Sequence, residues 1–435
     1  MSLHYVPAGV EAYYNQGTQL LVSKHSEPNL VEETTDFGIK YKRWNTREKK
    51  MVLSIFSPKG GVNVKEKFDV CVPIFNASFI QACGLTKVLA NPVHKPFKGE
   101  SFTTRKIETI IDSGGFQLLK STVDFVDPND VVREYNENAN IGMPLDLPME
   151  VSMEKTYFDA VSKLIRANDK FILERLNKGV HLALISHGTT LELRKRRLDV
   201  LDRETEAIAI AGLNIDPRKD VDHIQNIVEN LMYVLHRYRK TARYFHVLGV
   251  TSKMWMFVYA VIDALKFVRE IGADSVSHRL SALAGLYETE DFRTIQLAKD
   301  QKHRASLGCN CPVCFAVDDL RIMNHGILLE AHTLWVRSRQ AELMSELAHS
   351  YIKGHITLKS VHEYMQLRVP LHKFSYIIKY VQEVAASGKY KPIKPMRDGK
   401  TLFDAVKTTS KGSAKSDHVH NVIRKYEKFH RTRFL

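Results

Sequence analysis

Short runs of aliphatic and β-branched residues alternate with long amphipathic segments along the middle of the chain. This alternation is typical of βα units built around a parallel sheet. The sequence predicts strands at 107–111, 143–145, 181–185, 207–211, 244–248 and 273–276, with another at 69–75. Between them it predicts helices at 152–177, 191–203, 221–239 and 253–270.

Each predicted strand carries a polar or glycine-bearing cluster at its end, such as Asp112-Ser113-Gly114-Gly115 or Ser186-His187-Gly188. In a (β/α)8 barrel the carboxyl ends of the strands share one face, so these clusters would converge there. An open doubly wound sheet usually carries GxGxxG, which the sequence lacks. We therefore predict an α/β fold: a (β/α)8 TIM-type barrel with an inserted zinc-binding subdomain and a helical, basic C-terminal extension.

The composition points to a globular protein with a polyanionic partner. Of 435 residues, 44% are hydrophobic and 26% charged, which excludes a largely disordered chain. The net charge of +14 makes nucleic acid the obvious candidate partner. Neither a membrane span nor a secretion signal is recognised, so we expect no membrane partner and a cytoplasmic location.

Three of the five cysteines, Cys309, Cys311 and Cys314, lie within six residues. That spacing is too tight for a disulfide framework and is typical of a metal site. Either His325 or His332 could supply the fourth ligand of a tetrahedral zinc ion. The sequence predicts a structural zinc site with no open position for water.

Three regions are expected along the chain. Residues 1–300 would form the catalytic barrel with an N-terminal elaboration, 301–345 the zinc-binding subdomain, and 346–435 a helical basic extension. The last 47 residues carry 13 Lys and Arg against four Asp and Glu. They could be a solvated terminus or an arm that follows phosphates. The basic run RKRR at 194–197 could likewise contact phosphates or be an ordinary solvated helix face.

A carboxylate followed by paired glycines, as at Asp112, suits recognition of a flat polar heterocycle, because backbone N–H groups can approach the ligand. The same residues could instead form an Asx turn that enters a helix. The surrounding motifs bear on this choice. They are IDSGGFQ at 111–117, Leu145-Asp146, His187-Gly188, AIAGL at 209–213, HVLGV at 246–250, GAD at 272–274, and CNCPVC at 309–314 with His332-Thr-Leu.

In this order, the motifs resemble the tRNA-guanine transglycosylase superfamily over residues 105 to 335. Enzymes of that family are zinc-containing (β/α)8 barrels that exchange guanine for a 7-deazaguanine base. The resemblance implies that Asp112 contacts the base as general acid/base and that Asp146 reads the guanine edge. It implies His332 as the zinc histidine, since a polar-Leu pair follows it. The implied substrate-binding residues are Ser113, Gly114, Gly115, Asp146, His187, Gly188, Gly212, Leu248 and Gly249.

Asp274 is the expected nucleophile, which would attack the anomeric carbon and form a covalent glycosyl-enzyme. The sequence departs from the family here, because Ser277 stands where a second aspartate usually attacks. His187 likewise stands where the family usually has glutamine before glycine. A catalytically silent nucleic-acid-binding subunit therefore stays an alternative to the enzyme.

The basic loop with which the family grips tRNA is not recognisable in 278–287, and no further RNA-binding module is apparent. Both features favour the DNA-modifying (DpdA-type) 7-deazaguanine transglycosylases of bacteria and phages, with tRNA as the alternative substrate. A guanine in duplex DNA would have to be flipped out of the stack. Phe116 or Tyr287 could then stack on it. A homodimer or partner proteins of a DNA-modification system stay open.

Overall fold

A computed structural model describes most of the chain. The described residues are 3–8, 19–22, 30–34, 40–44, 70–73, 77–91, 102, 105–114, 125–145, 155–188, 190–213, 223–275, 277–297, 309, 311, 313–314, 326–393 and 413–431.

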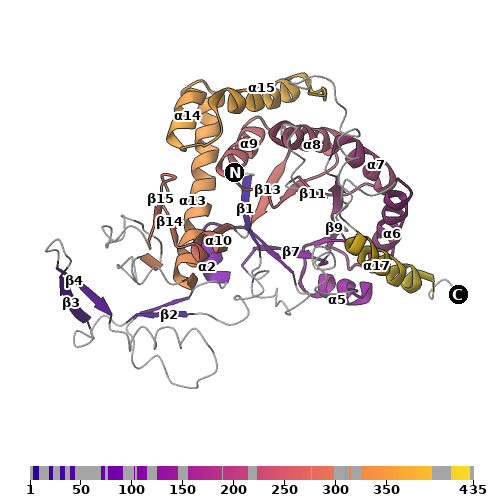
Figure 1. Cartoon of the computed structure of the whole chain (residues 1–435), viewed down its shortest axis with the longest axis horizontal. Helices are drawn as coiled ribbons and strands as arrows, with labels where there is room; N and C mark the ends of the chain where they lie inside the picture. Colours follow the sequence, from indigo (N-terminus) through magenta and orange to yellow (C-terminus); the bar gives the residue numbers. More distant parts are fainter. Residues whose placement is uncertain are drawn as a thin grey trace, which may run out of the picture.

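Two parallel sheets organise the protein, which is a mixed α/β structure (Figure 1). The five-stranded sheet has the order β1 (Leu3–Pro7), β13 (Glu270–Ser275), β12 (Tyr244–Leu248), β11 (Ala207–Ala211) and β10 (Leu184–His187). The four-stranded sheet has the order β6 (Lys87–Ala90), β7 (Glu108–Asp112), β8 (Ile141–Met143) and β9 (His181–Leu182). Predicted strands in 107–111, 181–185, 207–211 and 244–248 are confirmed.

The two sheets are connected at both of their margins. Strands β9 and β10 are separated only by Ala183, so one extended segment pairs with β8 on one side and with β11 on the other. At the opposite margins, Ala8 forms a parallel bridge with Leu89, which joins the end of β1 to β6. Residues from both sheets also pack into one apolar cluster, to which Val6, Ile110 and Ala209 belong.

Helices follow the strands on the outer side of the sheets (Figure 1). They are α5 (Pro128–Asn138), α6 (Lys155–Leu173), α7 (Leu191–Leu201), α8 (His223–Tyr238) and α9 (Lys253–Ala264). Of these, α9 is apolar almost all round, with Met254 to Asp263 buried. It is buried on both sides because further helices pack over its outer face.

The C-terminal part of the chain is helical and packs against the α/β part. Its elements are α10 (Ser277–Leu283), α13 (Gly326–Ile352), α14 (Leu358–Tyr364), α15 (Leu371–Ser387) and α17 (Ser413–Arg431). Helix α13 packs on α9 and α10, and α15 packs on α8 and α9. Helix α13 is continuous across residue 345, where the sequence placed the end of the zinc-binding subdomain.

The end of the chain is not simply a solvated basic arm. Helix α17 lies against α6, with the rings of Phe429 and Phe171 5.3 Å apart and in edge-to-face contact. Tyr426 is buried and its hydroxyl donates to the Val126 carbonyl at 3.0 Å. An apolar face therefore docks residues 413–431 onto the body of the protein.

Three pairs of antiparallel strands lie apart from the parallel sheets. They are β2 (Gln19–Val22) with β5 (Val70–Pro73), β3 (Leu30–Thr34) with β4 (Lys40–Trp44), and β14 (Leu286–Glu288) with β15 (Thr294–Gln296). The strand expected in 69–75 is thus β5, and it belongs to an antiparallel pair. The helix α2 (Ala77–Ala82) leads from this region to β6.

None of the described helices combines the length and the apolarity that a membrane crossing requires.

Candidate active site and candidate metal centre

The predicted site residues lie at the carboxyl ends of the parallel strands. Asp112 is the last residue of β7, His187 of β10 and Leu248 of β12, while Gly212 follows β11 directly. Because neighbouring strands are parallel in both sheets, these ends lie on the same side of the sheets. Two of the predicted residues, Gly115 and Asp146, lie outside the described residues.

Asp274 lies near the end of β13, opposite Val6 of β1 and Leu248 of β12. Its side chain is 12% exposed. Its Oδ1 atom accepts a hydrogen bond from the Gly249 amide at 3.1 Å and lies 3.2 Å from His246 Nε2. Gly249 has φ +71°, a left-handed conformation that glycine adopts without strain and that turns its N–H toward Asp274. The structure therefore brings the predicted Leu248, Gly249 and Asp274 together.

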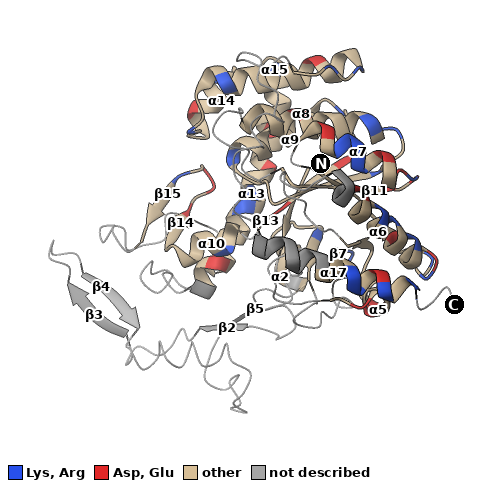
Figure 2. Ribbon diagram, turned by 45° about the vertical axis from the view of Figure 1, so that its right-hand side comes forward, with Lys and Arg blue, Asp and Glu red and all other residues tan. Residues whose placement is uncertain are grey.

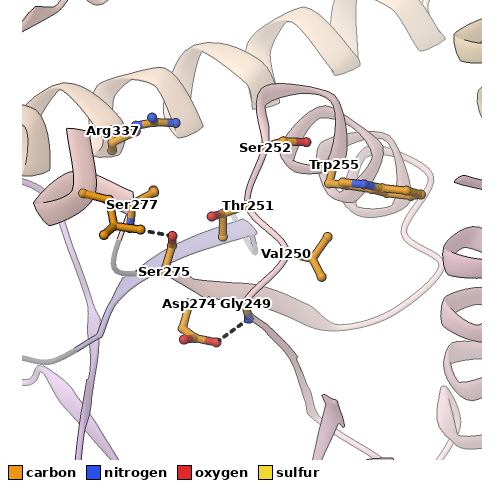
Figure 3. Close-up of a pocket in the computed structure, with 10 residues that line it drawn as sticks. Gly249, Val250, Thr251, Ser252, Trp255, Asp274, Ser275, Ser277 and Arg337 are labelled. Carbon is orange, nitrogen blue, oxygen red and sulfur yellow. Dashed lines mark hydrogen bonds between the residues drawn. The ribbon is translucent and has the colours of Figure 1, made fainter. Parts of the chain in front are cut away.

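A cavity of about 510 Å³ opens beside Asp274. The hydroxyl side chains of Thr251, Ser252 and Ser275 line it, together with Arg337 of α13 (Figure 3). Ser277 also lines this cavity, and its amide donates to Ser275 Oγ at 2.8 Å. Val250, Trp255 and Leu280 add apolar surface to the lining, and the Arg337 guanidinium is paired with Glu288 at 2.6 Å. The cavity therefore suits a ligand with both apolar and hydrogen-bonding parts.

Asp112 accepts a hydrogen bond at Oδ2 from the Asn91 side-chain amide at 2.8 Å. The amide of Ser113 donates to the Met143 carbonyl at 3.1 Å, and Gly114 has φ +86°. Asp112 is not among the residues that line the cavity beside Asp274. Strands β1 and β6 lie between β7 and β13. The backbones at Asp112 and Asp274 are thus three strand spacings apart, roughly 14 Å measured around the curved sheet, so one nucleotide would have to lie between the two side chains.

His187 and Gly212 meet at the ends of β10 and β11. His187 is 2% exposed, and a Cβ atom on Gly212 would come within 2.9 Å of its Nε2. Gly212 also has φ +74°, so both the backbone conformation and the close approach favour glycine. Besides the residues around Asp274 and those around Asp112, this pair forms a third group at the strand ends, next to β12.

Arg194 stabilises the ends of β10 and β11 from the interior of the protein. Its side chain is fully buried and donates from Nε to Asn230 Oδ1 at 2.8 Å. Its Nη atoms donate to Ser186 Oγ at 2.9 Å, to the Gly188 carbonyl at 2.5 Å and to the Ala211 carbonyl at 2.7 Å. The guanidinium thereby ties the end of β10 to the end of β11.

The interpretation of RKRR as a phosphate-contacting patch is therefore wrong for two of its residues. Arg194 and Arg197 are 0% and 1% exposed, because helix α7 turns this face toward β10 and β11. Arg196 lies on the other face, where it forms a bidentate pair with Asp159 at 2.7 and 2.8 Å.

Two residues that contact the predicted site had no role assigned from the sequence. Asn91 follows β6, a short apolar run that ends in a polar residue like the other strands. His246 stands inside the HVLGV motif, and alternation along the strand would have placed it on the same face as Leu248. The sequence therefore marked Asn91 and His246 as polar residues at or near strand ends, but it did not show that they contact Asp112 and Asp274.

Cys309, Cys311, Cys314 and His332 form one cluster, with their ligand atoms within 4.8 Å of one another. His332 Nδ1 lies 3.6, 3.5 and 3.3 Å from the three sulfur atoms in that order. Zinc bonds of about 2.3 Å to sulfur and 2.1 Å to nitrogen would place a tetrahedral S···N pair roughly 3.5 Å apart. The four residues therefore fit a metal ion, and His325 lies outside the described residues.

The surroundings of the cluster orient the histidine. His332 Nε2 lies 2.8 Å from the Glu288 carbonyl, so its proton is on Nε2 and Nδ1 is available as a ligand. Tyr287 is fully buried and stacks on the His332 ring at 4.0 Å. The expectation that Tyr287 could stack on a flipped base is therefore wrong.

A scan against protein-family models and a search of curated proteins each found no match. The resemblance noted from the sequence is accordingly carried by its motifs alone.

Proposed function

We propose that this protein is a DNA-guanine transglycosylase that replaces guanine with a 7-deazaguanine derivative. One observation carries the proposal above the others: Asp274, buried at the end of a parallel strand, has one oxygen held by the Gly249 amide next to a cavity of about 510 Å³. A carboxylate fixed at one oxygen and next to a cavity large enough for a base is suited to nucleophilic attack. Its place in the GAD motif agrees with the resemblance.

The architecture that we propose is a closed (β/α)8 barrel. With β9 and β10 taken as one strand, the two sheets together hold eight strands. The bridge between Ala8 and Leu89 and the continuity through Ala183 support closure at both margins. The shared apolar cluster inside is what a barrel of this size would require.

In the proposed reaction, Asp274 Oδ2 attacks C1′ of the target nucleotide while the bond from C1′ to guanine N9 breaks. Asp112 donates a proton to the leaving base and becomes a carboxylate. The incoming 7-deazaguanine then attacks C1′ through N9, the ester bond to Asp274 breaks, and Asp112 takes up the N9 proton. Both carboxyl groups return to their initial states, and the sugar-phosphate chain stays intact.

The Cys3His cluster would hold zinc in a structural role. Four protein ligands leave no open position for water or substrate, which is typical of structural sites. Bound zinc would supply folding energy by joining 309–314 to α13. Helix α13 also carries Arg337, one of the residues that line the cavity. Zinc would thus support one wall of the proposed site from outside it.

Nucleic acid as the substrate agrees with the net charge of +14. Helix α17 carries the basic residues Arg424, Lys425, Lys428 and Arg431 in exposed positions, and basic segments also recur on α6 and α7 (Figure 2). The exposed residues of α17 would attract a polyanion, whereas on α7 Arg194 and Arg197 are buried and Arg196 is paired with Asp159. We favour DNA over tRNA because the residues after Asp274 form the short helix α10 in place of a basic loop.

Base exchange tests the proposal directly. The purified, zinc-loaded protein is incubated with radiolabelled guanine and either plasmid DNA or tRNA, and label in the polymer is counted. Label in DNA is expected, and Asp274→Asn should lower incorporation at least a thousandfold, because the amide cannot form the glycosyl ester. A matched Asp159→Asn variant changes a surface carboxylate and should retain the wild-type rate.

The other outcomes separate the alternatives. Label in tRNA alone would refute DNA as the substrate. Absence of label in either polymer, with the protein folded and zinc bound, would refute the transglycosylase and favour the silent nucleic-acid-binding subunit. Exchange that survives Asp274→Asn but is lost in Ser277→Ala would move the essential residue to the serine.

A further inference from the structure

Tyr244, His246 and Asp274 form a continuous series of hydrogen bonds in the interior of the fold. The Tyr244 hydroxyl lies 2.7 Å from His246 Nδ1, and His246 Nε2 lies 3.2 Å from Asp274 Oδ1. Tyr244 is 0% and His246 1% exposed. Both project from the same face of β12, two residues apart, and this face meets Asp274 on the neighbouring strand β13.

The positions of the protons follow from counting donors and acceptors. An ionised Asp274 can only accept, so His246 must donate to it from Nε2. The other ring nitrogen is then free to accept from the Tyr244 hydroxyl if the imidazole is neutral. Burial and the carboxylates of Glu108 and Asp274 raise the pKa of Tyr244 well above its usual value, so its hydroxyl keeps the proton that it donates.

Neighbouring residues shape and orient this series. A Cβ atom on Gly272 would lie 2.5 Å from the Tyr244 hydroxyl, so only glycine leaves room for it. Lys87 Nζ lies 4.6 Å from the centre of the Tyr244 ring and 3.2 Å from Glu270. Lys87 is also paired with Glu108.

Asp274 Oδ1 thus receives two hydrogen bonds, from His246 and from the Gly249 amide. Within the described part of the chain, Oδ2 has no hydrogen bond, and Asp274 lines the cavity. Two donors on one oxygen fix the rotation of the carboxylate.

We propose that Tyr244 and His246 are positioning residues, which fix the orientation of the Asp274 carboxylate through Oδ1 and leave Oδ2 for the substrate. The catalytic consequence of this inference rests on the proposed function, whereas the arrangement of protons does not. His246 contacts Asp274 and Tyr244 acts through His246. The charged and titratable groups that face them are His4, Lys87, Glu108 and Glu270.

Three variants test the role in exchange. Tyr244→Phe removes the hydroxyl that fixes the tautomer, and His246→Leu removes the donor to Asp274. We expect kcat to fall roughly tenfold to a hundredfold in His246→Leu, which loses a hydrogen bond to a charged group, and roughly threefold to tenfold in Tyr244→Phe, which loses one to a neutral ring. KM should stay within about twofold of wild type in both. His246→Gln retains an amide donor near Nε2 and should recover most of the rate.

Tyr238→Phe is the matched control. Tyr238, on α8, is also buried, and its hydroxyl donates to Asp202 at 2.8 Å, away from the site. Its kcat should equal that of the wild type. If Tyr244→Phe behaves like Tyr238→Phe in an enzyme that does exchange bases, the positioning role is refuted.

A second measurement does not need enzymatic activity. Nitrogen-15 NMR of histidine-labelled protein, with the His246 signals assigned by their loss in His246→Gln, reports the tautomer directly. We expect a neutral ring with the proton on Nε2 at pH 7, and a change in the Nδ1 signal in Tyr244→Phe. An imidazolium or a proton on Nδ1 would refute the inference even in an active enzyme. A protein with the expected tautomer but no base exchange would instead refute only the proposed function.

Discussion

Replacing Arg194 by methionine would remove a guanidinium while keeping a side chain of similar length. In the native protein this group donates to Asn230 Oδ1, to the Ser186 hydroxyl and carbonyl, and to the Gly188 and Ala211 carbonyls. None of these acceptors can be reached by water when the side chain at 194 is fully buried. The change would leave several buried oxygen atoms without this donor.

The cost can be worked out from those contacts. Each buried acceptor that loses its partner costs roughly 1 kcal/mol or more. With three carbonyls and one amide oxygen affected, we expect the free energy of unfolding to fall by about 4 kcal/mol. A folded domain is typically stable by about 5–15 kcal/mol, so the variant would be only marginally folded. Arg194→Lys should cost less, about 2 kcal/mol, because an ammonium keeps the charge but offers fewer donors.

Urea unfolding followed by circular dichroism measures this difference through the midpoint and the slope of the transition. Arg196→Met is the matched control on the same helix. Arg196 pairs with Asp159 on the surface, where its side chain is 32% exposed, and its replacement should cost less than about 1 kcal/mol. Equal losses in Arg194→Met and Arg196→Met would contradict the assignment of Arg194 as a buried support of the strand ends.

Two further predictions concern metal and pH. Metal analysis is expected to detect one equivalent of zinc in the wild type, and Cys311→Ser should abolish it and lower the melting temperature. Cys83→Ser, at a buried cysteine outside the cluster, should keep the metal. Retention of zinc in Cys311→Ser would show that the ligand set is wrong. Burial, with help from Lys87, lowers the pKa of His4 to about 4 from an unfolded value of 6.5. Between pH 4 and 6.5 the unfolded chain therefore binds more protons than the folded protein. The contribution of His4 to the free energy of unfolding is complete above pH 6.5 and is lost as the pH falls toward 4. This contribution amounts to at most about 3 kcal/mol. Urea titration at each pH should show that His4→Gln has a weaker dependence of the free energy of unfolding on pH between 4 and 6.5. An unchanged slope would show that His4 is not held neutral.

The sequence by itself was sufficient for the α/β class and for most of the strands. Apolar runs such as 207–211 and 244–248 predicted β11 and β12, because a strand covered on both faces must be apolar along its length. It did not identify β1 or β6. Each is short, and each is a strand because neighbours in the parallel sheets supply its hydrogen bonds.

In the candidate site, too, the sequence predicted some features and the tertiary structure decided others. The spacing of three cysteines and a later histidine was enough to predict a metal cluster, because ligand chemistry depends on residue type. Which carboxylate meets which partner depended on strand register. Asn91 reaches Asp112, and His246 reaches Asp274, only because β6 and β12 are aligned with their neighbours in one particular register.

The run RKRR shows most clearly where local pattern stops being informative. Helical periodicity places 194 and 197 on one face and separates them from Arg196. Nothing in four consecutive basic letters tells which face will be covered. Packing of α7 against β10 and α8 buried two arginines and left Arg196 with Asp159 at the surface. Residue chemistry is a property of the sequence, whereas burial and choice of partner arise only when distant segments come into contact.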